Sequence, residues 1–269
     1  MAVNNFLDVT ELSGDLVSRD QITRMERRYG WVAGYARGRD VLEVACGTGQ
    51  GAGLIAAVAR SYVASDVSEE MLQRARQHYG GRVSFVRFDA EDMPLAAGSM
   101  DVLVVCEALY YFADASKFFR TVRNMLRPDG VLLIVSANKD LFDFNPSPYS
   151  QVYYGVRDLR DALAPLGFQC TFFGDSPLVE ASVLQRVLRP VKALVTRLGL
   201  MPKTMAGKKL LKRLVFGKLV PMPFELTMPA NPIGPPSRLS DDKPDLRHKV
   251  IFCAARLAPS EVGGPASTA

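Results

Sequence analysis

Glycines and one acidic residue stand at the ends of two apolar segments in the first quarter of this chain. The segment 41–45 leads into the turn Gly47-Thr-Gly49-Gln-Gly51, and the segment 62–65 ends at Asp66. Glycines let a backbone approach a ligand closely and adopt positive φ angles. A carboxylate at the end of the second strand can accept hydrogen bonds from both hydroxyls of a ribose. This order is typical of a parallel sheet that binds a nucleoside across its carboxyl edge.

The glycine turn by itself does not decide which nucleoside is bound, because it also satisfies the dinucleotide fingerprint G-x-G-x-x-A. Three further features favour a different cofactor. Glu43 lies inside the first apolar segment, and the acidic pair Asp89 and Glu91 follows the apolar segment 83–88. The segment 100–112 then supplies a fourth strand and an aromatic turn.

Taken together, these segments and Leu126–Val135 resemble the class I S-adenosylmethionine-dependent methyltransferases, over roughly residues 35–140. The resemblance implies that S-adenosyl-L-methionine is the cofactor. It also implies that Gly47 and Gly49 pass the methionine moiety and that Asp66 holds the ribose.

The resemblance extends to the adenine and to the N-terminal part of the chain. Asp89 and the Ala90 amide would bind the adenine, and Met71 would pack on its face. N-terminal helices of this family commonly close over the cofactor. Tyr29 or Arg28 could then reach the cofactor carboxylate, and the alternative for both residues is a purely structural role in packing. The expected cofactor residues are Tyr29, Glu43, Ala45, Gly47, Gly49, Asp66, Val67, Met71, Asp89, Ala90, Glu91 and Cys106.

The acceptor is expected outside the carboxyl ends of the fourth and fifth strands. Methyl transfer is an in-line displacement, so the protein must orient the nucleophile and in some cases remove a proton. Relatives often have histidine where Tyr110 or Tyr111 falls, so a histidine base is missing from that turn. Tyr111 is a candidate for orienting the acceptor, and Asp140 and Asp143 are candidates for a general base. Each also has a structural interpretation.

Composition narrows the class of protein. The chain has 269 residues, 48% of them hydrophobic, which is enough for a sizeable core. Its four cysteines are scattered without metal-ligand spacing and there are two histidines, so we expect no metal site. The N-terminus has neither a basic nor a long apolar region, and no run of 18 apolar residues occurs. A cytoplasmic location is therefore expected.

The order of elements predicts an α/β fold: a doubly wound seven-stranded, mostly parallel sheet with N-terminal cap helices and a helical insertion before the last strand. The resemblance implies that the last strand runs antiparallel between strands five and six. Helices are expected over 50–59, 69–79, 116–126 and 156–166. The expected strands are 41–45, 62–66, 83–88, 102–106, 131–136, 168–173 and 248–254.

The long connection before the last strand departs from the family, in which the last two strands often form a short hairpin. The segments 183–198 and 208–219 have one apolar face each and predict amphipathic helices, and the proline-rich segment 221–236 predicts an extended strap. We therefore divide the chain into cap helices (1–38), a core (39–173 and 248–257), an insertion that acts as a lid (174–247) and a flexible tail (258–269).

Positive charge is concentrated in the insertion, where residues 181–220 hold ten Lys and Arg and no Asp or Glu. Such a segment suits an anionic substrate or a membrane surface, and a solvated outer face is the alternative. Nucleic acid is disfavoured because Phe216 is the only aromatic residue there, and DNA is not expected as a partner.

These features predict a methyltransferase that acts on a small-molecule, natural-product or glycan-intermediate acceptor, with O-methylation favoured. An aromatic loop, Asn145–Tyr154, suits sugar rings or planar acceptors. An RNA or protein methyltransferase is the alternative within the same class. Alternatives of other classes are an NAD(P)-dependent oxidoreductase and a non-catalytic cofactor-binding partner protein. The sequence leaves the oligomeric state open.

Overall fold

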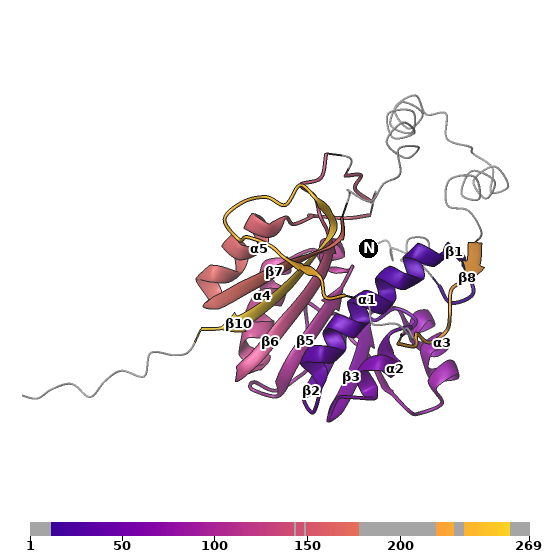
Figure 1. The fold of residues 1–269 in the computed structure, drawn as a ribbon. Helices are drawn as coiled ribbons and strands as arrows, with labels where there is room; N and C mark the ends of the chain where they lie inside the picture. The colour runs from indigo at the N-terminus through magenta and orange to yellow at the C-terminus, as the bar shows by residue number, and fades with distance from the viewer. Residues whose placement is uncertain (1–11, 143, 148, 178–218, 229–233, 259–269) are drawn as a thin grey trace, which may run out of the picture.

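The computed structural model describes residues 12–142, 144–147, 149–177, 219–228 and 234–258. Its main body is one twisted sheet with helices on both faces (Figure 1). The helices are α1 (Arg19–Ala36), α2 (Ala52–Ala56), α3 (Glu69–Tyr79), α4 (Ala115–Met125) and α5 (Val156–Leu163), with the short 3-10 turns η2 (Leu109–Tyr111) and η3 (Ala164–Leu166). The strands are β1 (Leu16–Ser18), β2 (Asp40–Val44), β3 (Ser61–Asp66), β4 (Ser84–Arg87), β5 (Met100–Cys106), β6 (Leu126–Ala137), β7 (Phe168–Pro177), β8 (Leu219–Pro221), β9 (Ser237–Arg238) and β10 (His248–Leu257).

The strands of the main sheet lie in the order β4-β3-β2-β5-β6-β10-β7-β9. Neighbouring strands from β4 to β6 are parallel, whereas β10 is antiparallel to both β6 and β7. The predicted doubly wound sheet is confirmed, and so is the antiparallel last strand between the fifth and sixth predicted strands. The first residue of β10 therefore lies at the same edge as the carboxyl ends of β5 and β6.

Two apolar cores hold the three layers together. One lies beneath α1, α2 and α3 and includes Val32, Ile55 and Leu72. The other lies beneath α4 and α5 and includes Phe118 and Leu159. The central strands β2, β5 and β6 are buried on both faces, which explains why their sequences are continuous apolar runs rather than alternating patterns.

Local signals in the sequence explain where the helices of the first half begin and end. Ser18 and Gln21 form a capping box at the start of α1, so the side chains satisfy two backbone N–H groups there. Ser68 caps α3, and Gly80 ends it in the left-handed conformation with φ 55°. These caps fix α1 and α3 beside the glycine turn.

Several boundaries differ from the sequence-based expectations. In the described part of residues 1–38 there is one helix, α1, preceded by strand β1. Helix α2 is shorter than predicted, because the left-handed Gly49 lies two residues before its N-cap, Gly51. The main sheet has eight strands and not seven, because the two-residue strand β9 pairs with β7.

Part of the predicted insertion is described, and the two predicted amphipathic helices lie almost entirely outside the described residues. Within the insertion the described chain resumes at residue 219, and we call residues 219–228 the return segment. It begins with β8, which pairs antiparallel with β1. In Figure 1 these two strands lie together beside the start of α1. Within the described ranges there is no helix long and apolar enough to cross a membrane.

Candidate functional site

The glycine turn between β2 and α2 is the most constrained backbone of the carboxyl edge. Ala45, Gly47 and Gly49 all have positive φ angles, of 53°, 59° and 74°. A Cβ built on Gly49 would lie 3.0 Å from the Phe85 ring, and one on Gly51 would lie 2.1 Å from the Tyr29 ring. Glycine is therefore required at Gly49 by conformation and at Gly51 by the close approach of α1.

Asp66 ends β3 and braces this turn. Its two carboxylate oxygens accept hydrogen bonds from the backbone N–H of Gly47 (2.9 Å) and of Ser68 (2.8 Å). The side chain is buried, and burial raises the pKa of Asp66 above its usual value. The contact of Asp66 with the ribose hydroxyls, which the resemblance implies, stays a prediction.

Glu43 lies deeper, beneath the turn, and anchors α1 to the sheet. It accepts a 2.8 Å hydrogen bond from the Tyr29 hydroxyl and another from the Tyr62 hydroxyl. Burial raises the pKa of Glu43. The Tyr29 ring lies against Gly51 and its hydroxyl is bonded to Glu43, so Tyr29 supports the turn from below. A direct cofactor contact of Tyr29 or Glu43 stays a prediction.

Arg28 and Glu107 form an ion pair next to the turn. The Arg28 Nη2 lies 3.1 Å from the Glu107 Oε1, and the Tyr110 hydroxyl donates to the other Glu107 oxygen. Among the described residues the buried Nε of Arg28 has no hydrogen-bond partner. Glu107 directly follows β5 and has φ 52°, and Ala45 directly follows β2 and has φ 53°. Both of these neighbouring strands are therefore followed by a left-handed residue that is not glycine. Such strain is concentrated at functional sites.

The predicted adenine side lies around the ends of β3 and β4. Val67 is 44% exposed, whereas Met71 and Ala90 are buried. The Asp89 side chain accepts from the Glu91 N–H at 2.9 Å. Glu91 accepts from the backbone N–H of Ala113 and Asp114, and so it ties this loop to the start of α4.

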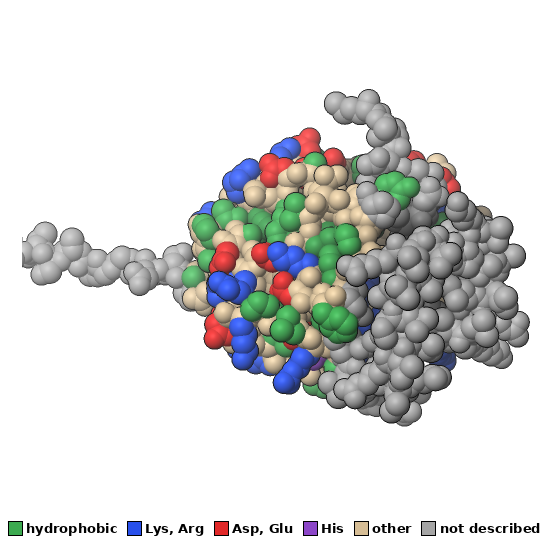
Figure 2. Space-filling model, turned by 90° about the horizontal axis from the view of Figure 1, so that it is seen from above, with side chains coloured by type: hydrophobic (Ala, Val, Ile, Leu, Met, Phe, Trp, Pro, Cys, Tyr) green, Lys and Arg blue, Asp and Glu red, His purple; other side chains and the backbone are tan. Residues whose placement is uncertain are grey.

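The loops after β5 and β6 carry an aromatic cluster at the expected acceptor side. Tyr110 stacks on Tyr153 with ring centroids 4.4 Å apart, and Tyr111 and Phe144 meet these two rings edge-on. Figure 2 looks down on this end of the molecule, where hydrophobic side chains lie among basic and acidic ones on the described surface. Phe142 is 77% exposed there.

The candidate bases fall into different places. Asp140 lies against Gly155 at the start of α5, and burial, followed by the nearby Asp158 charge, raises the pKa of Asp140. Asp143 lies outside the described residues. His248, at the start of β10, is buried, and its Nδ1 lies 3.1 Å from an Asp245 carboxylate oxygen.

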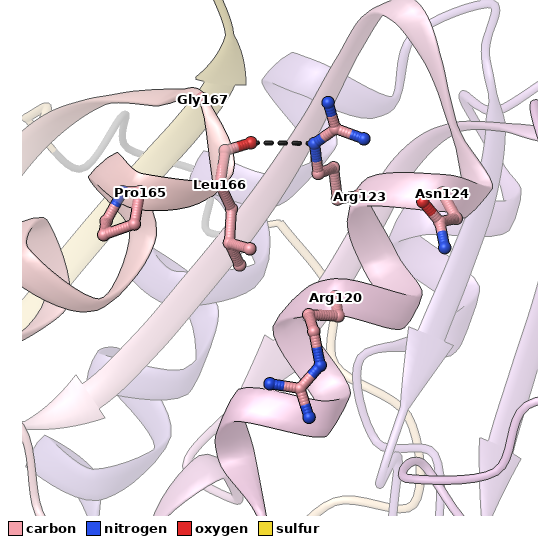
Figure 3. Close-up of a pocket in the computed structure, with 6 residues that line it drawn as sticks. All are labelled: Arg120, Arg123, Asn124, Pro165, Leu166 and Gly167. Atoms are coloured by element: carbon pink, nitrogen blue, oxygen red, sulfur yellow. Dashed lines mark hydrogen bonds between the residues drawn. The ribbon is translucent and has the colours of Figure 1, made fainter.

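A separate open cleft of about 530 Å³ lies between α4 and η3 (Figure 3). Arg120, Arg123 and Asn124 line it, and the Arg123 Nε donates to the Leu166 carbonyl. The cleft lies by the start of β7, at the end of the sheet opposite the glycine turn. It is therefore not part of the candidate site.

The structure brings together the predicted residues Ala45, Gly47, Gly49, Asp66 and Cys106 along the ends of β2, β3 and β5. It adds Glu107, which follows β5 directly and pairs with Arg28. The signal for it was its position directly after a buried strand. Within the described ranges, no group of three or more His, Cys, Asp or Glu side chains has the arrangement of a metal site.

Comparison with known proteins identifies the core. Residues 42–134 match the family described as "Methyltransferase domain". The chain is 33% identical to a Mycolicibacterium smegmatis protein named "Probable S-adenosylmethionine-dependent methyltransferase", over 54% of this chain and 58% of that one. It is 26% identical to "O-methyltransferase cnsE" of Penicillium expansum, over 76% and 73% of the two chains. It is 29% identical to "Ubiquinone/menaquinone biosynthesis C-methyltransferase UbiE" of Haemophilus ducreyi, over 53% and 57%.

A solved structure shows the same fold. The YcgJ protein of Bacillus subtilis has a TM-score of 0.54 and 19% identity, and the match covers 86% of this chain and 98% of that one. The chain thus contains a class I, Rossmann-like S-adenosylmethionine-dependent methyltransferase domain, and S-adenosyl-L-methionine is the cofactor of this domain. The chain spans about half the length of the curated relatives it matches first, 58% and 48% of them.

Proposed function

We propose that this protein transfers a methyl group from S-adenosyl-L-methionine to a hydroxyl group of a small-molecule, natural-product or glycan-intermediate acceptor. The main observation in support is the arrangement at the carboxyl ends of β2 and β3, here called the cofactor edge. There a left-handed glycine turn is braced by the buried carboxylate of Asp66. O-methylation is supported by the relative named O-methyltransferase, whose match covers 76% of this chain. The C-methyltransferase relative makes C-methylation the alternative.

The residues present fit this cofactor. Asp66 ends β3 next to the glycine turn, where the resemblance implies a ribose contact, and the buried Arg28 Nε lacks a partner among the described residues. When bound, the cofactor supplies an electrophilic methyl group on a sulfonium. We propose that Arg28 and Glu107 hold the charged amino-acid end and that Val67, Met71 and Ala90 surround the adenine.

The acceptor side is proposed to orient the nucleophile with aromatic rings. Tyr110, Tyr111 and Tyr153 form a wall that suits a sugar ring or a planar acceptor. Asp140 is the proposed proton acceptor within the described chain, because a raised pKa brings a carboxylate closer to the range of an effective base. Asp143 stays a proposal of the same kind.

Further proposals concern the insertion and the compartment. The insertion was predicted as residues 174–247, but 174–177 belong to β7 and 237–238 to β9 of the main sheet. We propose that the rest of the insertion contributes a lid over the acceptor and that the basic segment 181–220 binds an anionic acceptor or membrane surface. We propose a cytoplasmic location, which agrees with four free cysteines. The salt dependence of acceptor KM and of binding to anionic vesicles tests the basic segment, since screening weakens exposed charge contacts.

The test of function is turnover with cofactor labelled in its methyl group. Phenols, glycan intermediates, quinols, RNA and peptides serve as acceptors, and the product is analysed for O-, N- or C-methylation. We expect S-adenosylhomocysteine to bind and a hydroxyl-bearing small molecule to be methylated. Binding without turnover of any acceptor would leave a cofactor-binding partner protein. Preferential binding of NAD would overturn the proposal.

A further inference from the structure

The segment that returns from the insertion is joined to the segment before α1. Strands β1 and β8 pair over three residues each, from Leu16 to Ser18 and from Leu219 to Pro221. Backbone hydrogen bonds extend the pairing, from Gly14 N–H to the Met222 carbonyl and from Met222 N–H to the Asp15 carbonyl, both 2.8 Å. We call residues 12–18 and 219–228 together the clasp.

Both segments of the clasp touch the glycine turn directly, through residues outside the paired strands. Leu226 N–H donates to the Gln50 carbonyl at 2.7 Å, and the hydroxyls of Ser13 and Thr48 lie 3.4 Å apart. A Cβ built on Gly53 would lie 1.9 Å from a Glu225 carboxylate oxygen, so the return segment rests on the start of α2. The clasp thus contacts Thr48, Gln50 and Gly53, inside and just after the turn.

The remaining contacts of the clasp join it to the core beneath α1 and to the end of α3. Met222 and Leu226 are buried in the core beneath α1. Glu225 pairs with Arg82 at 2.7 Å and with His78 at 3.0 Å, and Phe224 stacks on His78 at the end of α3. A two-stranded ribbon on its own is marginal in water, so the clasp depends on these contacts to stay closed. Because β1 and β8 form a sheet of their own, the clasp can open without breaking a strand pairing of the main sheet.

We propose that the clasp and the cofactor turn are conformationally coupled: the closed clasp holds the turn in the shape that binds the cofactor, so opening of the clasp and binding of the cofactor oppose each other. The choice of S-adenosyl-L-methionine as the ligand rests on the proposed function. The contacts between the clasp and the turn do not depend on which acceptor is methylated. Linkage is reciprocal, so a cofactor that favours the closed clasp must also stabilise it. Leu226 and Glu225 act as positioning residues in this coupling.

The first test is hydrogen exchange of the full chain with and without S-adenosylhomocysteine. We expect the ligand to slow exchange at least tenfold in the turn (45–53) and also in the return segment (219–228). Protection of the turn with no change in the return segment would overturn the coupling while leaving the proposed function intact. Failure of S-adenosylhomocysteine to bind would overturn both.

The second test compares two matched variants by calorimetry with S-adenosylhomocysteine. Glu225→Gln removes the charge that holds the clasp to α3, and Glu70→Gln breaks the exposed Glu70–Arg74 pair on the same helix without touching the clasp. We expect a threefold to tenfold higher Kd for Glu225→Gln and less than a twofold change for Glu70→Gln. Equal effects of the two variants would overturn the coupling. The exchange experiment uses the unaltered chain and so decides the matter even if Glu225→Gln unfolds.

Discussion

The cofactor edge and the aromatic loops after β5 and β6, here called the proposed acceptor loops, lie at the same end of the sheet and are built in different ways. In the cofactor edge, backbone angles and backbone hydrogen bonds set the shape: Gly47 and Gly49 are left-handed, and Asp66 accepts from two main-chain N–H groups. In the proposed acceptor loops, aromatic side chains stack on one another and large apolar side chains such as Phe142 stay exposed.

The difference indicates which of the two regions tolerates amino-acid substitution. A site defined by the backbone binds one ligand shape and fails when a Cβ is added. A site defined by side chains can be rebuilt by substitution without a change of fold. We therefore expect changes at the cofactor edge to alter cofactor affinity and changes at the loops to alter acceptor use.

Removal of the insertion should have the largest effect, because it should abolish acceptor turnover and leave cofactor binding in place. We expect replacement of residues 183–217 by a short Gly/Ser linker to abolish acceptor turnover, because the proposed lid is lost. S-adenosylhomocysteine binding should persist, since the clasp strand β8 is kept. The measurements are turnover and calorimetry. Unchanged turnover would contradict the lid.

Gly51→Ala should strongly weaken cofactor binding at the cofactor edge. The new methyl group would lie 2.1 Å from the Tyr29 ring and force α1 or the turn to move. Overpacking costs about 1–3 kcal/mol, and where this strain falls on the cofactor-binding shape of the turn, affinity drops roughly fivefold to a hundredfold. The control is Gly34→Ala in α1, where nothing lies within 4 Å of the new Cβ. Similar affinities of the two variants would contradict a backbone-defined site.

Asp66→Ala and Asp89→Ala compare a buried and an exposed acid at the same edge. Loss of Asp66 leaves the Gly47 N–H without its acceptor and removes the proposed ribose contacts, at about 1.5–3 kcal/mol, so we expect at least tenfold weaker cofactor binding. Asp89 is exposed, and we expect a smaller loss. Equal losses, measured by calorimetry, would refute the ribose assignment.

Arg28→Gln should discriminate between two ligands. We expect affinity for S-adenosylhomocysteine to fall about fivefold to tenfold, because a charge-assisted contact to the amino-acid end is lost. Affinity for 5′-methylthioadenosine, which lacks that end, should change less than twofold. Arg27→Gln is the matched control, since Arg27 pairs with Asp175 on β7, away from the turn. A parallel loss for both ligands would show that Arg28 acts only through packing.

Glu225 should give the smallest effect, visible as a pH dependence of stability. The hydrogen bond from Arg82 is the largest cause that lowers the Glu225 pKa below its usual value. A lowered folded-state pKa contributes stability above the unfolded-state value, and this contribution is lost as pH falls through the folded-state value. We expect Glu225→Gln to lower the free energy of unfolding by up to about 1 kcal/mol at pH 7, since the pair is partly exposed. The difference from the unaltered chain should vanish in acid.

The sheet was predictable because its signals are local. The buried runs of β2, β5 and β6, the glycine turn and the caps at Ser68 and Gly80 lie within a few residues of the structures they specify. The position of β10 followed from the resemblance and not from periodicity.

The remainder of the site depends on contacts between distant residues. The side chains of Arg28 and Glu107 meet across 79 positions of the chain, and no short pattern marks them as partners. The β1–β8 pair joins segments about 200 residues apart through strands of three residues each, too short for periodicity to show. The close approach of Tyr29 to Gly51 was likewise hidden, because a glycine in a turn has several explanations.

The two outer strands of the sheet have a consequence for association between molecules. At one end β4 is four residues long and includes Arg87, and at the other β9 occupies the free side of β7 for two residues, directly after Pro235 and Pro236. Short strands, charge and proline at sheet margins discourage pairing with another chain. Long ladders of backbone hydrogen bonds between copies are therefore opposed at both margins, so self-association of this protein should involve its helical faces or loops.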